Sequence, residues 1–94
     1  MPDDLKAAFQ IAVERVRELA ERPDNDTLLK LYALYKQGSE GDASGPKPGF
    51  FDFVGTAKHE AWVKLKGMSR DEAMLKYIDL VERLGHPADG TARS

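Results

Sequence analysis

Tyrosine and lysine side chains at helical spacing are the residues of this sequence best suited to chemistry. Tyr32 lies one helical turn before Lys36, with Tyr35 beside it, and Lys58 lies one turn before Trp62. Lysine ammonium groups and tyrosine hydroxyls bind phosphate oxygens, and flat aromatic rings stack on purine bases. These residue types therefore suit a phosphorylated nucleoside. They also suit an ordinary helix surface on which lysine stems cover aromatic rings, and spacing alone favours that structural interpretation.

Groups that would support catalysis or bind a metal are scarce. The sequence has no cysteine, which excludes disulfides, thiolate zinc sites and a cysteine nucleophile. Its two histidines, His59 and His86, have only acidic residues as candidate co-ligands at helical spacing. No serine has the context of a nucleophile elbow, and no glycine-rich stretch follows a strand pattern. We therefore expect a protein that is not an enzyme and has neither a metal nor another cofactor.

Length and charge narrow the range of partners. The 94 residues suit one small domain, predicted over residues 1–88, followed by a flexible tail at 89–94. The net charge of -2 provides no overall field for nucleic acid, so an anionic ligand would need a local basic cluster. No segment approaches the roughly 20 apolar residues of a membrane span, and the N-terminus is acidic, unlike a signal peptide. We expect a cytoplasmic monomer that is not integral to a membrane.

Four segments carry apolar residues at intervals of three and four, which predicts four amphipathic helices. The first starts near Asp3 or Asp4, either of which can cap it, and its apolar face reaches Leu19 and Ala20 before Pro23 stops it. The second helix, about 26–40, has a wide apolar and aromatic surface. This surface contacts either the core and a ligand or two other helices, and spacing alone favours contact with two other helices. Its two stripes are Leu28, Leu31 and Tyr35, and Leu29, Tyr32 and Lys36.

The third helix is predicted over about 53–66. Capping or stop residues mark the ends of both the third and the fourth helix. They are Asp52 and Gly67 around the third, Ser69 with Glu72 as a capping box before the fourth, and Gly85 with Pro87 after it. Four such helices on a short chain indicate an all-α four-helix bundle. The connections before the second and fourth helices are short. The glycine- and proline-rich connection at 41–49 is longer, so it forms either a functional edge or a crossover between non-neighbouring helices.

A series of motifs in a fixed order covers about residues 5–84. It comprises Phe9, Pro23, Leu31-Tyr32-Ala33-Leu34-Tyr35-Lys36-Gln37, Gly41-Asp42, Pro48-Gly49, Asp52, Ala57-Lys58, Ala61-Trp62, Lys66-Gly67, Ala73 and Tyr77-Ile78. The series resembles the acyl-CoA-binding protein family. The resemblance implies an up-down-down-up bundle and a non-catalytic carrier that binds long-chain acyl-CoA reversibly and delivers it for lipid metabolism.

The resemblance also implies roles for individual residues. Tyr32, Lys36 and Lys58 look like the residues that hold the ribose 3′-phosphate of CoA. Tyr35 and Tyr77 look like the aromatic residues near the adenine and the inner part of the ligand. The remaining positions are Arg17, similar to a basic residue that reaches the phosphates, and Phe9, Val13, Leu28 and Leu29, which would border the acyl chain.

Two residues depart from the family pattern. His59 stands where members commonly carry tryptophan, a change that bears on packing and affinity. Gly38 stands where a small residue such as alanine is common, and glycine is expected to fray the end of the second helix.

The main alternative function is a helical protein-interaction module that has lost CoA binding. For a carrier, acyl-CoA-using enzymes are the candidate protein partners.

Overall fold

The computed structural model describes residues 2–85, and within them every regular element is a helix. The helices are α1 (Pro2–Val16), α2 (Asn25–Glu40), α3 (Phe53–Val63) and α4 (Arg70–Gly85). The predicted all-α class is therefore confirmed. The predicted boundary at residue 88, the tail at 89–94 and the stop at Pro87 lie outside the described residues.

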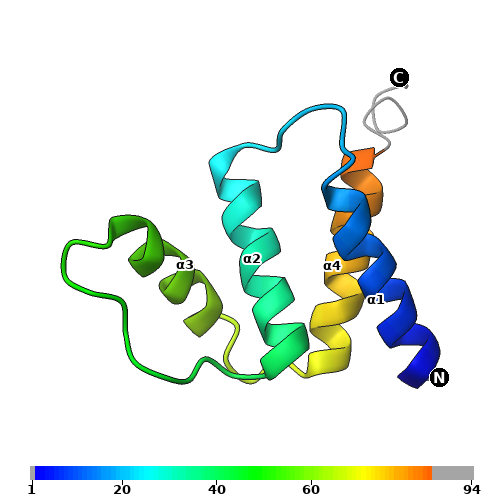
Figure 1. Ribbon diagram of the computed structural model, residues 1–94. Helices are drawn as coiled ribbons and strands as arrows, with labels where there is room; N and C mark the ends of the chain where they lie inside the picture. The colour runs from blue at the N-terminus through cyan, green and yellow to red at the C-terminus, as the bar shows by residue number, and fades with distance from the viewer. Residues whose placement is uncertain (1, 86–94) are drawn as a thin grey trace.

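The helices pack in the order α1, α4, α2, α3, which differs from their order in the chain. α1 contacts α4, α4 contacts α2, and α2 contacts α3. Figure 1 shows that α1 and α4 run in one direction while α2 and α3 run in the other. This is the up-down-down-up arrangement that the family resemblance implied, and it leaves α3 at one end of the row.

The core lies among α1, α4 and α2. In the part of the chain that the structure describes, apolar side chains with at most 5% of their surface exposed come from these three helices, with one exception on α3. They are Phe9 and Ala12 of α1, Leu31, Ala33 and Leu34 of α2, Ala73, Met74, Tyr77 and Val81 of α4, and Trp62 of α3. Burying them is the main favourable term in folding, so three helices form the frame and α3 is an addition to it.

α1 differs from its prediction at both ends. It begins at Pro2, so Asp3 and Asp4 lie inside its first turn, and the prediction that one of them caps the helix is wrong. Proline suits this first position because it has no amide hydrogen to leave unpaired. α1 also ends at Val16, after which the backbone tightens into bonds between residues three apart. Leu19 and Ala20, predicted on the helix, lie in the following connection.

The early end of α1 follows from the order of the helices. α4 lies between α1 and α2, so the connection at 17–24 must cross two interhelical spacings (Figure 1). At roughly 8–10 Å each, this takes about five or six extended residues, which a helix reaching Pro23 would not leave. The connection at 41–52 joins the neighbours α2 and α3, and it is long because the chain must return along α2 before a parallel helix can start. The alternative that it crosses between non-neighbouring helices is wrong.

Side-chain caps fix the starts of the other helices. The Thr27 amide donates to Asp24 at 2.8 Å, and the Gly55 amide donates to Asp52 at 2.9 Å. Hydrogen bonds from the side chain and the amide of Thr27 lower the pKa of Asp24. The Glu72 amide donates to the Ser69 hydroxyl at 3.0 Å. The predicted caps at Asp52 and Ser69 are thus confirmed. α3 ends at Val63, before the predicted Lys66, because residues 64–66 continue as a tighter turn.

Gly38 is a close-packing position within α2. The helix continues past it to Glu40, so the expected fraying at this glycine is wrong. Gly38 is buried, and a Cβ atom there would lie 3.1 Å from Cγ of Met74 and 3.3 Å from Cζ of Phe9. The absence of a side chain therefore lets α2 approach α4 closely, which offsets the low helix propensity of glycine.

Candidate functional site

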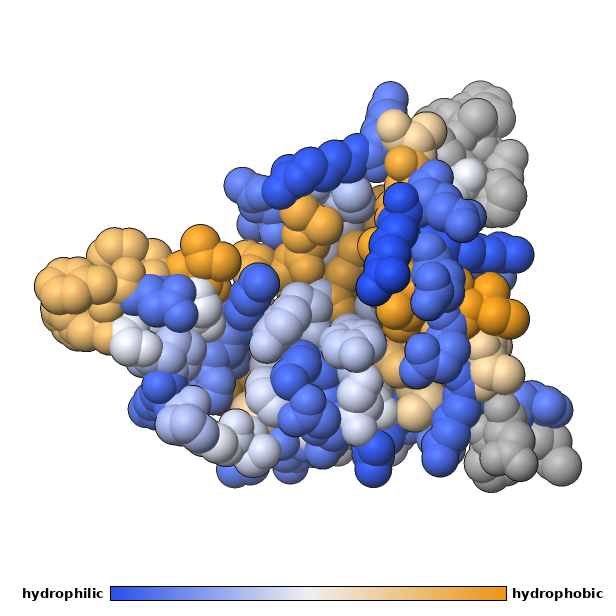
Figure 2. Space-filling model, in the orientation of Figure 1, coloured by the Kyte–Doolittle hydropathy of each residue, from blue (hydrophilic) through white to orange (hydrophobic). Residues whose placement is uncertain are grey.

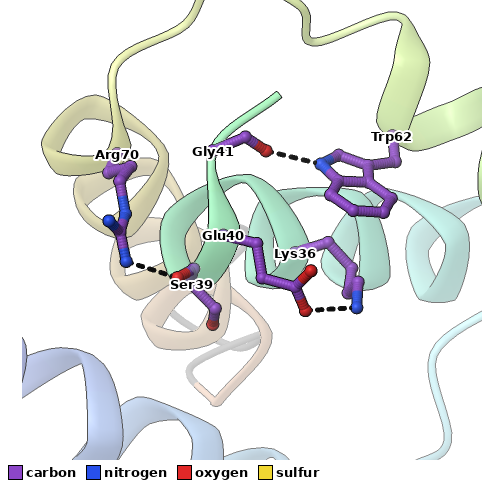
Figure 3. A network of polar contacts seen from close by, with 6 residues as sticks. All are labelled: Lys36, Ser39, Glu40, Gly41, Trp62 and Arg70. Atoms are coloured by element: carbon purple, nitrogen blue, oxygen red, sulfur yellow. Dashed lines mark hydrogen bonds and ion pairs between the residues drawn. The ribbon is translucent and has the colours of Figure 1, made fainter. Parts of the chain in front are cut away.

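α3 is attached to α2 chiefly through Trp62. The indole is 5% exposed, and its Nε1 donates to the carbonyl of Gly41 at 2.8 Å (Figure 3). Arg70, at the start of α4, donates to the carbonyls of Gly38, at 3.4 Å, and Ser39, which the end of a helix otherwise leaves unpaired. These bonds fix the end of α2 against both α3 and the start of α4.

A second set of bonds ties the loop after α2 to the turn before α4. Gln37 is fully buried, and its Nε2 donates to Asp42 at 2.9 Å and to the carbonyl of Met68 at 2.8 Å. The same Asp42 oxygen accepts from the Gly67 amide at 2.9 Å. The bonds from Gly67 and Gln37 hold the pKa of Asp42 below its usual value. Gln37, part of the motif that carries the family resemblance, therefore positions the backbone around the site.

Lys36 occupies a defined place between an aromatic ring and a carboxylate. Its Nζ lies 4.8 Å from the centre of the Trp62 ring, and it pairs with Glu40 one turn further along α2 (Figure 3). The hydrogen bond to Glu40 raises the pKa of Lys36. With its side chain 21% exposed, Lys36 is protonated and held in position, but Glu40 competes for it with any anionic ligand.

Lys58 makes the corresponding contact from α3 to α2. It extends from α3 so that its Nζ lies 5.2 Å from the centre of the Tyr32 ring on α2. A lysine of each helix thus covers an aromatic ring of the other, with Lys36 over Trp62 and Lys58 over Tyr32. The structure brings together the three residues expected at a phosphate, and it adds Trp62 as the ring that supports Lys36.

An apolar groove of about 690 Å³ extends along α2 and α3 beside Lys58. Leu28, Leu29 and Tyr32 form one wall, and residues from the first turns of α3 form the other. Phe53, Val54 and Ala57 belong to this second wall and were absent from the predicted site. Phe53 and Val54 directly follow a helix cap and remain 74% and 67% exposed. An apolar first turn with no place in a core pattern is the sequence signal that could have identified them.

Phe9, Tyr35 and Tyr77 form an aromatic cluster on the other side of α2. The ring centre of Phe9 lies 5.9 Å from that of Tyr35 and 5.2 Å from that of Tyr77. Phe9 and Tyr77 are buried in the core, whereas Tyr35 is 39% exposed. Burial raises the pKa of Tyr77, an effect that Tyr35 increases and the charge of Arg17 opposes. Of the three, Tyr35 offers a ring face to a ligand.

Val13 and Arg17 lie apart from the groove. Val13 is half-buried against the core cluster, and Arg17 follows the end of α1 with its guanidinium 4.0 Å from Glu14. The side chain of Arg17 is 75% exposed. Arg17 is close enough to Tyr77 to affect its pKa, so it belongs with the aromatic cluster. The predicted site residues therefore form two groups that meet on α2.

Two kinds of feature are absent from the part of the chain that the structure describes. Among residues 2–85, no three histidine, cysteine, aspartate or glutamate side chains gather as they would around a metal ion. None of the helices in the same range combines the length and apolar character needed to cross a membrane.

Comparisons with known proteins agree on one family. The family model described as acyl CoA binding protein matches residues 6–81. Acyl-CoA-binding protein homolog 1 of Caenorhabditis elegans is 49% identical over 77 residues, which cover 82% of this chain and 90% of that protein. Enoyl-CoA delta isomerase 2 of Rattus norvegicus is 41% identical over 85 residues, 90% of this chain but only 22% of that protein. The crystal structure of Oryza sativa acyl-CoA-binding protein 2 superposes with a TM-score of 0.84 at 33% identity, covering 93% of this chain and 97% of that chain.

Proposed function

Because the chain belongs to the acyl-CoA-binding protein family, we propose that it is a non-catalytic carrier of long-chain acyl-CoA thioesters. It binds one ligand reversibly, buffers its free concentration, and delivers it as a cytoplasmic monomer to enzymes of lipid metabolism. The observation that carries this proposal is the apolar groove between α2 and α3, which is lined by Lys58, one of the two ring-supported lysines.

The lysines select the CoA half of the ligand. Lys36 and Lys58 hold the 3′-phosphate together with the hydroxyl of Tyr32, since ammonium groups and hydroxyls form short, charge-assisted bonds to phosphate oxygens. Tyr35 stacks on the adenine, Tyr77 supports it from the core, and Arg17 approaches the phosphates from the end of α1. A chain with a net charge of -2 attracts a polyanion only through such a local cluster.

The groove selects the acyl half. Leu28 and Leu29 face Phe53 and Ala57 across it, and Val13 and Phe9 support α2 from behind. Each methylene taken out of water contributes about 0.8 kcal/mol. Two further carbons therefore tighten binding by roughly tenfold while the groove still covers them. Covering the thioester also shields it from water, and none of these steps requires a base or a nucleophile.

Isothermal titration calorimetry with palmitoyl-CoA tests the proposal. The expected result is one-to-one binding that is much tighter than binding of free CoA or palmitate, because each of these ligands engages only one half of the site. A folded protein that takes up no palmitoyl-CoA would exclude the carrier function. The same apolar groove would then favour the alternative, a helical protein-interaction module, since an amphipathic helix fits a groove of this kind.

A further inference from the structure

A turn before α3 displays two phenylalanines to solvent. Residues 49–52 form the turn, closed by a hydrogen bond of 3.0 Å from the Asp52 amide to the Gly49 carbonyl. Phe50 and Phe51 occupy its two corner positions and are 88% and 79% exposed. Their ring centres lie 5.0 Å apart in an edge-to-face pair. Both large apolar side chains are thus held outward, away from the core.

The turn is anchored and projects from the molecule. Asp52 closes it and caps α3 through the Gly55 amide, and the Thr56 amide bonds to the Asp52 carbonyl at 2.9 Å. The exposed apolar residues of this region, which we call the aromatic tip, are Phe50, Phe51, Phe53 and Val54. Figure 2 shows apolar surface concentrated at the end of the molecule where Figure 1 places the start of α3, farthest from α1. Exposed apolar patches of this kind mark sites of contact with proteins or membranes.

We propose that the aromatic tip inserts into the headgroup region of a phospholipid bilayer and docks the protein there to exchange acyl-CoA. The tip is a convex projection, which suits insertion into a fluid surface. A self-contact through four side chains would fall well short of the roughly 20 residues a side in a stable dimer. The hollow beside Phe50 is lined by two basic residues, Lys47 and Lys64, and by one acidic residue, Glu60. The excess of positive charge favours an anionic headgroup layer.

The position of the tip links docking to the exchange of acyl-CoA, an inference that rests on the proposed carrier function. Phe53 and Val54 belong both to the tip and to the wall of the acyl groove. Insertion of Phe50 and Phe51 brings the end of the groove to the bilayer surface. An acyl chain then passes between lipid and groove with little of it exposed to water, which would otherwise cost free energy for each methylene.

The test compares the full chain with two double variants on phosphatidylcholine vesicles, with and without phosphatidylserine. Phe50→Ser with Phe51→Ser removes the corner residues, which lie outside the acyl groove. Ile11→Ser with Leu75→Ser is the matched control, because these residues are 54% and 57% exposed on α1 and α4, away from the tip. Partition is measured by vesicle sedimentation, folding by circular dichroism and palmitoyl-CoA affinity in solution by calorimetry.

We expect the native chain to partition onto vesicles, and the tip variant to partition at least about tenfold more weakly. The control should stay within about twofold of the native chain, as should the tip variant's affinity for palmitoyl-CoA in solution. Lys47→Ala should weaken partition severalfold, and only on vesicles with phosphatidylserine. If the double tip variant does not fold, Phe50→Ser and Phe51→Ser are measured singly.

Several results would overturn the docking proposal. They are no partition of the native chain, equal partition of the tip variant, an equal loss in the control, or a dimer in sedimentation equilibrium that the tip substitutions dissociate. Failure of the carrier function is distinguishable from these, because partition onto vesicles needs no acyl-CoA. If the native chain docks on vesicles but does not bind palmitoyl-CoA, the docking proposal stands and the proposed carrier function is excluded.

Discussion

The frame of α1, α4 and α2 and the edge formed by α2 and α3 bury very different amounts of apolar side chain. Within residues 2–85, the frame contains every strongly buried apolar residue except Trp62, whereas the start of α3 exposes Phe53 and Val54. α3 contacts only α2 among the helices. The frame thus provides most of the stabilisation of the fold by apolar burial, and the edge leaves apolar surface and lysines accessible to a ligand.

This difference teaches how a small domain keeps a binding site without a large cavity. A chain of 94 residues buries a limited fraction of its surface, so an enclosed pocket would remove much of its core. An end helix held by one tryptophan and a few hydrogen bonds provides a groove at lower cost to the core. The predictions that follow test whether α3 is separable from the frame, from the largest expected effect to the smallest.

Substitution of Trp62 should have the largest effect on stability. Trp62→Ala removes the only strongly buried apolar residue of α3 and should lower the free energy of unfolding by about 3–5 kcal/mol in urea denaturation followed by circular dichroism. Trp62→Phe keeps most of the packing but loses the bond to Gly41, at about 1–2 kcal/mol. Val63→Ala, at an exposed neighbour, is the control and should change the value by about 0.5 kcal/mol or less. A small effect of Trp62→Ala would show that α3 is held by something else.

Substitution of Lys58 should affect binding and leave the frame unchanged. Because a charged hydrogen bond contributes about 1.5–3 kcal/mol, Lys58→Ala should weaken palmitoyl-CoA binding roughly tenfold to hundredfold in calorimetry. Because Lys58 is exposed, the loss of its contact with Tyr32 should lower the free energy of unfolding by only about 0.5–1 kcal/mol. Lys64→Ala, at an exposed lysine beyond the end of α3, controls for loss of general positive charge. Equal effects at Lys58 and Lys64 would argue against a specific phosphate contact.

Removal of the charge of Glu40 should strengthen binding. Glu40 pairs with Lys36 in the structure, so a phosphate must displace it. Glu40→Gln should therefore raise the affinity for palmitoyl-CoA severalfold, within the roughly 1 kcal/mol that an exposed ion pair contributes. Glu72→Gln, which removes a similar i,i+4 pair with Lys76 on α4, should leave the affinity unchanged. Weaker binding by Glu40→Gln would mean that Glu40 positions Lys36 for its ligand.

The pH dependence of stability should show the smallest effect. The pKa of Asp42 is lowered in the folded chain, so its ionised form stabilises the fold above the ordinary value of 3.8. This stabilisation is lost as the pH falls through the lowered pKa. Asp42→Asn should therefore lower the Tm slightly at neutral pH, by a margin that narrows below pH 3.8. A Tm difference between Asp42→Asn and the native chain that stays constant below pH 3.8, or no difference at neutral pH, would contradict the prediction.

Local patterns in the sequence predict the starts of α3 and α4 and the core face of α4 well. The caps at Asp52 and Ser69 follow from side chains that pair with backbone amides a few residues away. The core residues of α4 follow from apolar spacing along a single helix. The end of α1 does not follow from such patterns, because it depends on α4 lying between α1 and α2. Gly38 was misjudged for a similar reason, since its effect depends on Met74 and Phe9 in other helices.

The same distinction between local pattern and tertiary packing applies to the candidate site. The sequence by itself determined which residue types stand on each helix face, and so placed Tyr32 with Lys36 and Lys58 with Trp62, because positions four apart meet on any helix. Only the tertiary structure decided that Lys58 covers Tyr32, that Lys36 covers Trp62 while pairing with Glu40, and that Phe53 and Ala57 complete the groove. The physical reason is that these contacts depend on how α3 lies against α2, which the packing of Trp62 and the long return loop determine.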